Sequence, residues 1–245
     1  MSGVTTDFCR PGLSVIVPAF NEEILLDGSI RALRSALDAS GVISEIIIVD
    51  DGSTDRTGPF ADVLANNLAG VRAFHQQNQG IGGAFRTGVS LSNGDYVMLW
   101  PADMPATADD LRVYTRYLGT VDVIVGCRRS RAGYNSLMLL NAWMYPKLVG
   151  MLFGLKIRDV NWIHVYRRST FLNVRLSQQG IPMLAEALVR LRDAGASFVE
   201  VDVDMRERDG GIASASRLRV MWRTLSGLLT FWYRRRQEIS GTRKI

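Results

Sequence analysis

Residues 45–55 have the sequence EIIIVDDGSTD, in which four β-branched apolar residues are followed at once by two aspartates, a glycine and hydroxyl side chains. The apolar run predicts a strand that is buried on both faces, as in a parallel sheet. The polar residues predict its carboxyl end, where open α/β sheets bind ligands. Asp50 and Asp51 could accept hydrogen bonds there from a ribose or a base. In the competing interpretation they only end the strand, and Ser53 or Asp55 caps the next helix.

Strand and helix patterns alternate on either side of this stretch. Residues 13–17 predict a strand that Pro18 ends, because proline has no N–H to donate to a sheet. Asn21 is placed to cap the helix that follows, and a second helix at about 57–67 leads to a short strand at 71–74. This alternation predicts right-handed parallel crossovers within one α/β domain, for which 245 residues provide a sufficient core.

Two further segments have glycine-rich or acidic ends. In NQGIGGAFRTG, residues 78–88, Gly82 and the neighbouring glycines would let backbone amides approach a phosphate at the start of a helix. The segment is neither a Walker A loop nor a Rossmann fingerprint, so by itself it indicates little. Residues 94–100, GDYVMLW, predict another buried strand, which runs into Ala102 and Asp103. This strand also ends at a carboxylate.

Composition limits the class of protein. Hydrophobic residues make up 47% and charged residues 22%, as in a globular protein, and the net charge is +5. The basic character is concentrated at the end of the chain, where residues 205–245 contain ten Lys and Arg against three Asp and Glu. Two cysteines predict neither a disulfide framework nor a zinc site, and the first twelve residues lack the pattern of a secretory signal. A basic tail without a recognised binding module does not predict nucleic acid as a partner.

Taken in order, these motifs resemble those of the family 2 glycosyltransferases. The resemblance implies a GT-A fold, a Rossmann-like, mostly parallel sheet flanked by helices. It is greatest to the branch of dolichyl-phosphate mannosyltransferases and polyprenyl-phosphate glycosyltransferases. The matching segments are VPAFNE at 17–22, VDDGSTD at 49–55, NQG at 78–80, GDYV at 94–97, AD at 102–103, GCR at 126–128, residues 159–168 and RDGGIAS at 208–214.

The resemblance also implies roles for individual residues in a nucleotide-sugar site. Asp103 matches the last aspartate of the DxD motif, which holds a divalent metal against the donor diphosphate. With Arg128 and Arg208, it is expected to take part in catalysis. Donor contacts are implied for Pro18, Phe20, Glu22, Asp50, Asp51, Gly82, Ala102 and Asp103, and phosphate contacts, on the donor or a lipid acceptor, for Arg128, Arg129, Arg131, Arg208 and Ser214.

The metal motif departs from the family pattern. Pro101 stands where the first aspartate is usual, and Pro105 stands where a glutamine is common. One carboxylate with diphosphate and water ligands can still hold Mg²⁺ or Mn²⁺ at Asp103. Alternatively, an arginine cluster after the fifth strand supplies the positive charge, or these arginines form only a solvated loop.

Two apolar segments indicate contact with a membrane. Residues 136–155 are long enough to span a bilayer, but Pro146 at the centre favours two short helices that lie in the interface. Residues 216–245 predict a basic amphipathic helix and tail after a GT-A domain at 13–215, with residues 1–12 as an N-terminal tail. The alternatives are a core hairpin for the first segment, and docking on its own domain or a membrane partner subunit for the second. The resulting expectation is a peripheral or monotopic enzyme on the cytoplasmic face of a membrane, with a membrane partner subunit or as a homo-oligomer.

A polyprenyl-phosphate acceptor needs no general base, because its phosphate is already an anion. Direct attack on the anomeric carbon then implies inversion. A transferase with a soluble or polysaccharide acceptor would need a base, for which Asp159 or Glu186 is available, whereas His75 and His164 are expected to be structural. A nucleotide-binding pseudoenzyme or scaffold is the remaining alternative.

Overall fold

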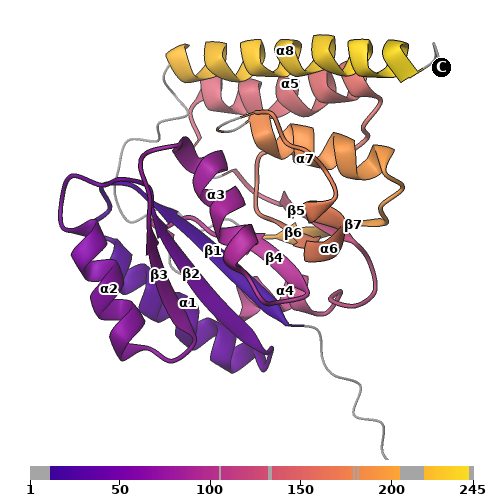
Figure 1. Ribbon diagram of the computed structural model, residues 1–245. Coiled ribbons are helices and arrows are strands. Elements are labelled where there is room, and N and C mark those ends of the chain that lie inside the picture. The colour runs from indigo at the N-terminus through magenta and orange to yellow at the C-terminus, as the bar shows by residue number, and fades with distance from the viewer. Residues whose placement is uncertain are drawn as a thin grey trace, which may run out of the picture.

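The computed structural model describes residues 12–242, except 105, 132–133, 179, 181 and 205–217. Its helices and strands alternate along most of the chain (Figure 1). In chain order they are β1 (Leu13–Ala19), α1 (Leu26–Ser40), β2 (Ser44–Asp50), α2 (Thr57–Asn67), β3 (Val71–His75), α3 (Gly80–Leu91), β4 (Tyr96–Leu99), α4 (Ala108–Thr115), β5 (Val123–Arg128), α5 (Ser136–Phe153), β6 (His164–Arg167), α6 (Arg168–Leu172), α7 (Pro182–Asp193), β7 (Phe198–Val203) and α8 (Leu218–Thr242).

The strands of the described residues form one sheet in the order β3-β2-β1-β4-β6-β5-β7. β6 runs antiparallel to β4 and β5, and the other neighbouring pairs are parallel. The order of the strands reverses between β1 and β4, so the carboxyl ends of these two strands form a switch point, where sheets of this kind bind ligands. The mixed, mostly parallel α/β sheet predicted from the sequence is confirmed.

Alternate residues of the central strands face two apolar layers. Val15 and Ile48 pack toward α1, α2 and α4, whereas Ile16 and Ile47 pack toward α3, α5, α7 and α8. This burial on both faces explains the unbroken apolar run of β2. Gly88 lets α3 approach the sheet closely, because a Cβ at this position would lie 2.3 Å from a side-chain carbon of Ile16.

Two predicted boundaries are wrong. β1 continues through Pro18 to Ala19, because β4 pairs with β1 only as far as Ile16 and the missing N–H removes no hydrogen bond from that pairing. Asn21 does not cap a helix, since it adopts a left-handed conformation with a φ of 57° and α1 begins only at Leu26.

The apolar segment at 136–155 forms one helix, α5, and the prediction of two short helices is therefore wrong. Pro146 lies inside α5. Buried side chains before and after it, Tyr145 and Val149, pack in the apolar layer that also contains α3, α7 and α8. The opposite face is open to solvent, where Trp143 is 59% exposed. Across the described residues, no helix combines the length and the apolar character needed to cross a membrane.

α8 lies along α5 and α7 at one end of the molecule (Figure 1). Leu228 of α8 is buried, and Phe231 of α8 stacks on Phe153 of α5 with the ring centres 4.9 Å apart. On the same face of α8, Arg190 of α7 lies over the Phe231 ring, and both of its terminal nitrogens lie 3.1 Å from the carboxylate oxygens of Glu238. One face of this predicted amphipathic helix thus docks on its own domain.

Candidate active site

The loops after β1 and β2 are joined by hydrogen bonds between short polar side chains. The Asn21 side-chain oxygen accepts the Thr54 N–H at 2.8 Å, and the Asn21 N–H donates to the Ser53 hydroxyl oxygen at 3.0 Å. The Glu22 N–H donates to the Thr57 hydroxyl oxygen at 2.7 Å. The left-handed conformation of Asn21 is what turns its amide group toward the second loop.

Asp51 ties the loop after β2 to the loop after β3. It is buried, and its Oδ1 accepts hydrogen bonds from the Gln76 side chain at 2.6 Å and from the Gln79 N–H at 2.8 Å. Gly52 has a φ of 77°, and a Cβ there would lie 2.9 Å from the Asn78 nitrogen, so only glycine allows this approach. The carboxyl ends of β1, β2 and β3 thereby form one braced edge.

Asp50 faces the opposite way, toward α2. Its Oδ1 accepts the Ser53 N–H at 3.0 Å, and its Oδ2 lies 3.0 Å from Nδ1 of His75. Burial raises the pKa of Asp50, but the hydrogen bonds from Ser53 and His75 outweigh it and hold this pKa below its ordinary value. The contacts of Asp50 are therefore those of a residue that shapes the loop, whereas Asp51 faces the neighbouring strands' loops.

The other residues expected to contact the donor lie around this edge. Pro18 is the next-to-last residue of β1, close to the switch point. Phe20 directly follows the strand, and 47% of its surface is exposed. Glu22 is half-buried in the same loop. Gly82 is buried in the first turn of α3.

The loop after β4 carries Ala102 and Asp103 at the switch point. The Trp100 N–H donates to the Ile16 carbonyl of β1 at 2.9 Å, and the Trp100 indole N–H donates to the Met104 carbonyl at 2.8 Å. These two bonds fix the turn that presents Asp103, which is half-buried, while Ala102 is buried. The described residues contain no group of three or more His, Cys, Asp and Glu side chains with the arrangement of a metal site. Asp103 could contribute one carboxylate to a cation, with donor diphosphate and water oxygens as further ligands.

Arg128, at the end of β5, is held by a buried carboxylate. Its Nε and Nη2 donate to the two oxygens of Asp159 at 2.6 and 2.7 Å, and its side chain is only 7% exposed. Nη1 donates to the Tyr134 hydroxyl oxygen at 2.6 Å, and the guanidinium lies 4.7 Å from the ring centre of Trp162. Burial raises the pKa of Asp159, but the adjacent Arg128 guanidinium and then Arg131 lower it further than burial raises it.

The remaining arginines of this loop are more accessible. Nη2 of Arg131 lies 3.4 Å from Asp159, and its Nε has no hydrogen-bond partner among the described residues. Arg129 is largely exposed and lies 4.0 Å from Asp204. Arg208 and Ser214, for which phosphate contacts are expected, lie outside the described residues.

Asp159 and Glu186, the two candidate bases, are both engaged. Glu186 is fully buried in α7, where its oxygens accept hydrogen bonds from Ser177, from the Gln178 N–H and from Arg190. His164 is also fully buried, and burial lowers its pKa. None of these three groups is placed to take a proton from an acceptor that enters from solvent.

Sequence reasoning missed the partners of the charged groups. The Asp159 contact of Arg128 spans 31 positions in the sequence, and Tyr134 and Trp162 gave no signal of their own. His75 was expected to be structural, but its position between two carboxylates was not foreseen. Nothing in the local sequence marks such pairs, because they depend on how β5, β6 and the loops cross in space.

The strand order and the switch point are those of the GT-A class of glycosyltransferase folds. The solved structures agree. Mannosyl-3-phosphoglycerate synthase from Rubrobacter xylanophilus superimposes with a TM-score of 0.72 at 21% identity, over 93% of this chain and 75% of that one. Glucosyl-3-phosphoglycerate synthase from Mycobacterium tuberculosis, crystallised with Mn²⁺, UDP and phosphoglyceric acid, gives 0.70 at 18% identity, over 91% and 78% of the two chains.

Sequence comparison gives the family. The model of glycosyl transferase family 2 matches residues 14–187, and the chain belongs to this family. It is 27% identical to an undecaprenyl-phosphate mannosyltransferase of Micrococcus luteus, over 82% of this chain and 86% of the relative. It is 28% identical to an undecaprenyl-phosphate 4-deoxy-4-formamido-L-arabinose transferase of Pseudomonas paraeruginosa, over 85% of this chain but only 62% of the relative. The resemblance drawn from the motifs is confirmed.

Proposed function

We propose that this glycosyltransferase moves a sugar from a nucleotide-sugar donor to a polyprenyl phosphate, with inversion at the anomeric carbon. The observation that carries the proposal is the pairing of Asp159 with Arg128, which leaves this carboxylate unable to act as a base. A phosphate acceptor needs none. The names of the relatives that cover most of the chain support the same class of acceptor.

In this reaction an oxygen of the lipid phosphate attacks the anomeric carbon and forms the new bond. The bond from that carbon to the nucleoside diphosphate breaks, and the electron pair leaves with the diphosphate. No proton has to be removed from the acceptor. Catalysis then consists of aligning the two anions and stabilising the charge on the leaving group.

The donor would lie against the braced edge and the switch point. The loop held by Asp51 would receive the nucleoside, and Asp103 would face the diphosphate. A divalent cation bound at Asp103 would supply charge stabilisation to the leaving diphosphate. Solved structures of the same fold hold Mn²⁺ or Mg²⁺ together with UDP, which supports a metal in this class.

The acceptor phosphate would lie near the arginines after β5. Arg128 is committed to Asp159, so its role is to position this loop. The Arg131 side chain is partly exposed and Arg129 is largely exposed, so these two guanidinium groups would offer donors to a phosphate. Arg208 and Ser214 remain proposed phosphate ligands on the strength of the motif that contains them.

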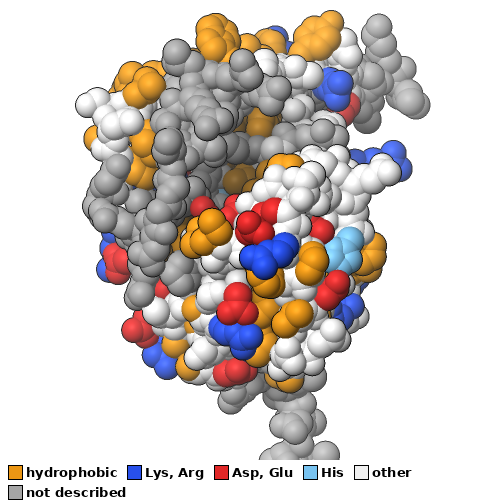
Figure 2. Space-filling view, turned by 90° about the vertical axis from the view of Figure 1, so that its left-hand side faces the viewer, with side chains coloured by type: hydrophobic (Ala, Val, Ile, Leu, Met, Phe, Trp, Pro, Cys, Tyr) orange, Lys and Arg blue, Asp and Glu red, His pale blue; other side chains and the backbone are white. Residues whose placement is uncertain are grey.

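The face formed by α5 and α8 would lie on the membrane. Trp143 of α5 and Trp222 of α8 are 59% and 72% exposed, and Figure 2 shows apolar side chains gathered at the end of the molecule that carries these helices. Lys147 and Arg236 stack on Trp143 and Trp232, so cations stand beside the apolar surface. Apolar residues flanked by cations are what an anionic lipid surface binds. α5 begins a few residues after the arginines, which would bring the lipid headgroup and the site together.

The proposal is tested by transfer of labelled sugar from a panel of nucleotide sugars to polyprenyl phosphate in detergent. Asp103→Asn should lower the rate about a hundredfold or more, because it removes charge at the leaving group. Asp109→Asn is the matched control, since Asp109 is exposed on α4 and forms an ion pair with Arg112 in the same helix. Equal rates in the two variants would overturn the role of Asp103.

The same assay tests the metal requirement and the identity of the acceptor independently. Excess chelator should abolish transfer if the cation is required. Transfer that survives the chelator would assign stabilisation of the leaving diphosphate to the arginines. Transfer to soluble sugars but not to polyprenyl phosphate would overturn the proposed acceptor. Nucleotide binding without transfer from any donor would instead favour a pseudoenzyme.

A further inference from the structure

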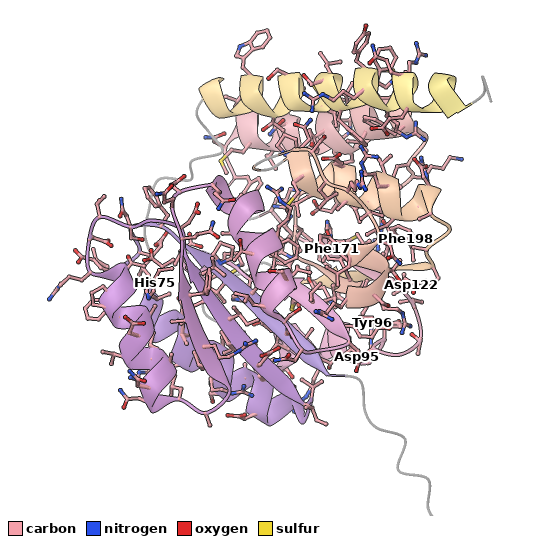
Figure 3. All side chains as sticks on the ribbon, viewed as in Figure 1. His75, Asp95, Tyr96, Asp122, Phe171 and Phe198 are labelled. Atoms are coloured by element: carbon pink, nitrogen blue, oxygen red, sulfur yellow. The ribbon has the colours of Figure 1, made fainter. Side chains whose placement is uncertain are left out.

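His75 lies outside the residues assigned to the reaction, at the end of β3 and next to α2 (Figure 3). Its Nδ1 lies 3.0 Å from Oδ2 of Asp50, and its Nε2 lies 3.0 Å from Oδ1 of Asp62. An ionised carboxylate can only accept a hydrogen bond, so both ring nitrogens must donate. That condition is met by the imidazolium and by neither neutral tautomer.

Each of the two elements packed against the His75 ring contributes one charged group that faces it. β2 contributes Asp50, whose side chain is 9% exposed, and α2 contributes Asp62, whose side chain is 60% exposed. The hydrogen bond to Asp50 and then that to Asp62 raise the pKa of His75. α2 also approaches closely at Gly58, where a Cβ would lie 2.9 Å from Oδ2 of Asp50.

His75 is coupled to the donor loop through Asp50 and through its own neighbour. Asp50 accepts the Ser53 N–H with its other oxygen, and its carbonyl accepts the Gln76 N–H at 3.0 Å. The Gln76 side chain in turn donates to Asp51. A change in the His75 contact would therefore move the loop that contains Asp51.

We propose that His75 is a positioning residue for the donor: its imidazolium clamps Asp50 to α2, and loss of its proton loosens the loop after β2 and weakens nucleotide binding. The proposal deepens the proposed function at the donor site and is independent of the acceptor. It predicts an affinity that falls as the pH rises, although no base takes part in the reaction.

The chain offers a clean measurement of this titration, because it contains two histidines and His164 is fully buried. NMR of the His75 ring protons gives its titration midpoint, and calorimetry with UDP and GDP gives nucleotide affinity over the same range. His75→Gln is measured at each pH, so that titration of the nucleotide phosphate itself cancels in the ratio. Wild type should bind about threefold to tenfold more tightly than His75→Gln below the midpoint, and similarly to it above.

Asp62→Asn gives a test that a merely structural role would not meet. It removes the outer carboxylate, which should move the His75 midpoint to lower pH and move the change in nucleotide affinity by the same amount. Affinity that is unchanged across the His75 titration, or a binding profile that stays in place when the NMR midpoint moves, would overturn the inference alone. Failure of wild type to bind either nucleotide would overturn the donor site on which it rests.

Discussion

The loops after β1, β2 and β3 are braced by many hydrogen bonds among short side chains, whereas the loop after β5 is held mainly by one buried ion pair. The first region is the braced edge described above, here called the donor edge. In it, residues such as Asn21 and Thr54 form hydrogen bonds between the loops that follow adjacent strands. The second region is here called the arginine cluster (Arg128, Arg131, Tyr134, Asp159 and Trp162). In it, Asp159 accepts hydrogen bonds from both arginines. The donor edge should therefore lose stability gradually when it is mutated, and the arginine cluster abruptly.

The largest effect is expected when the ion pair is broken. Asp159→Asn leaves the buried Arg128 guanidinium without its counter-charge, and we expect it to cost about 3–5 kcal/mol in the free energy of unfolding. Urea denaturation monitored by circular dichroism measures this cost. Adding Arg128→Met to Asp159→Asn should recover part of the loss, because an apolar side chain needs no partner there. A loss below about 1 kcal/mol in the single variant would contradict the abrupt behaviour assigned to this cluster.

The donor edge should respond in binding more than in stability. Asp51→Asn keeps an oxygen that can accept from Gln76 and Gln79 but removes the negative charge. We expect UDP or GDP affinity to fall about tenfold to a hundredfold, as for loss of a hydrogen bond to a charged group, with little change in the urea midpoint. Asp38→Asn, at an exposed position of α1, is the control. A variant that loses stability but keeps its nucleotide affinity would make Asp51 structural.

A smaller effect is expected at the face formed by α5 and α8. Trp143→Ala together with Trp222→Ala should reduce binding to vesicles that contain anionic lipid by about tenfold or more, because exposed indole rings are removed from the lipid contact. Sedimentation with vesicles measures the bound fraction. Ile43→Ala is the control, since Ile43 is 62% exposed near the amino end of β2. An equal loss in the control, or none in the double variant, would argue against this face as the membrane contact.

The same contrast explains what could be predicted from the sequence. The buried run of β2, the carboxylates after β2 and β4, and the family followed from local patterns, because the donor edge is built from residues close to the strand ends that carry them. The engagement of Arg128 by Asp159 could not be predicted, because the pair joins segments 31 positions apart. Pro18 and Pro146 were misjudged for a related reason: whether a proline ends a strand or breaks a helix depends on its neighbours in space.

The smallest effect, and the one that sharpens the contrast most, is in the pH dependence of stability. The pKa of Asp159 is lowered in the folded protein, so its contribution is present above its unfolded pKa and is lost as the pH falls through the folded value. The pKa of His75 is raised above 6.5, so its contribution is present below that value and is lost as the pH rises through the folded pKa.

The Arg128–Asp159 pair should therefore weaken as the pH falls, whereas the contact of His75 with its two carboxylates should weaken as the pH rises. Because 45% of the His75 side chain is exposed, its contribution is screened and should be at most about 1 kcal/mol. Urea midpoints should fall for wild type between neutral and alkaline pH, and the fall should begin at lower pH in Asp62→Asn. If the urea midpoint depended on alkaline pH in the same way in wild type and Asp62→Asn, the contact of His75 with Asp62 would add nothing to the stability of the donor edge. The hydrogen bonds between its loops would then be sufficient to hold the donor edge in place.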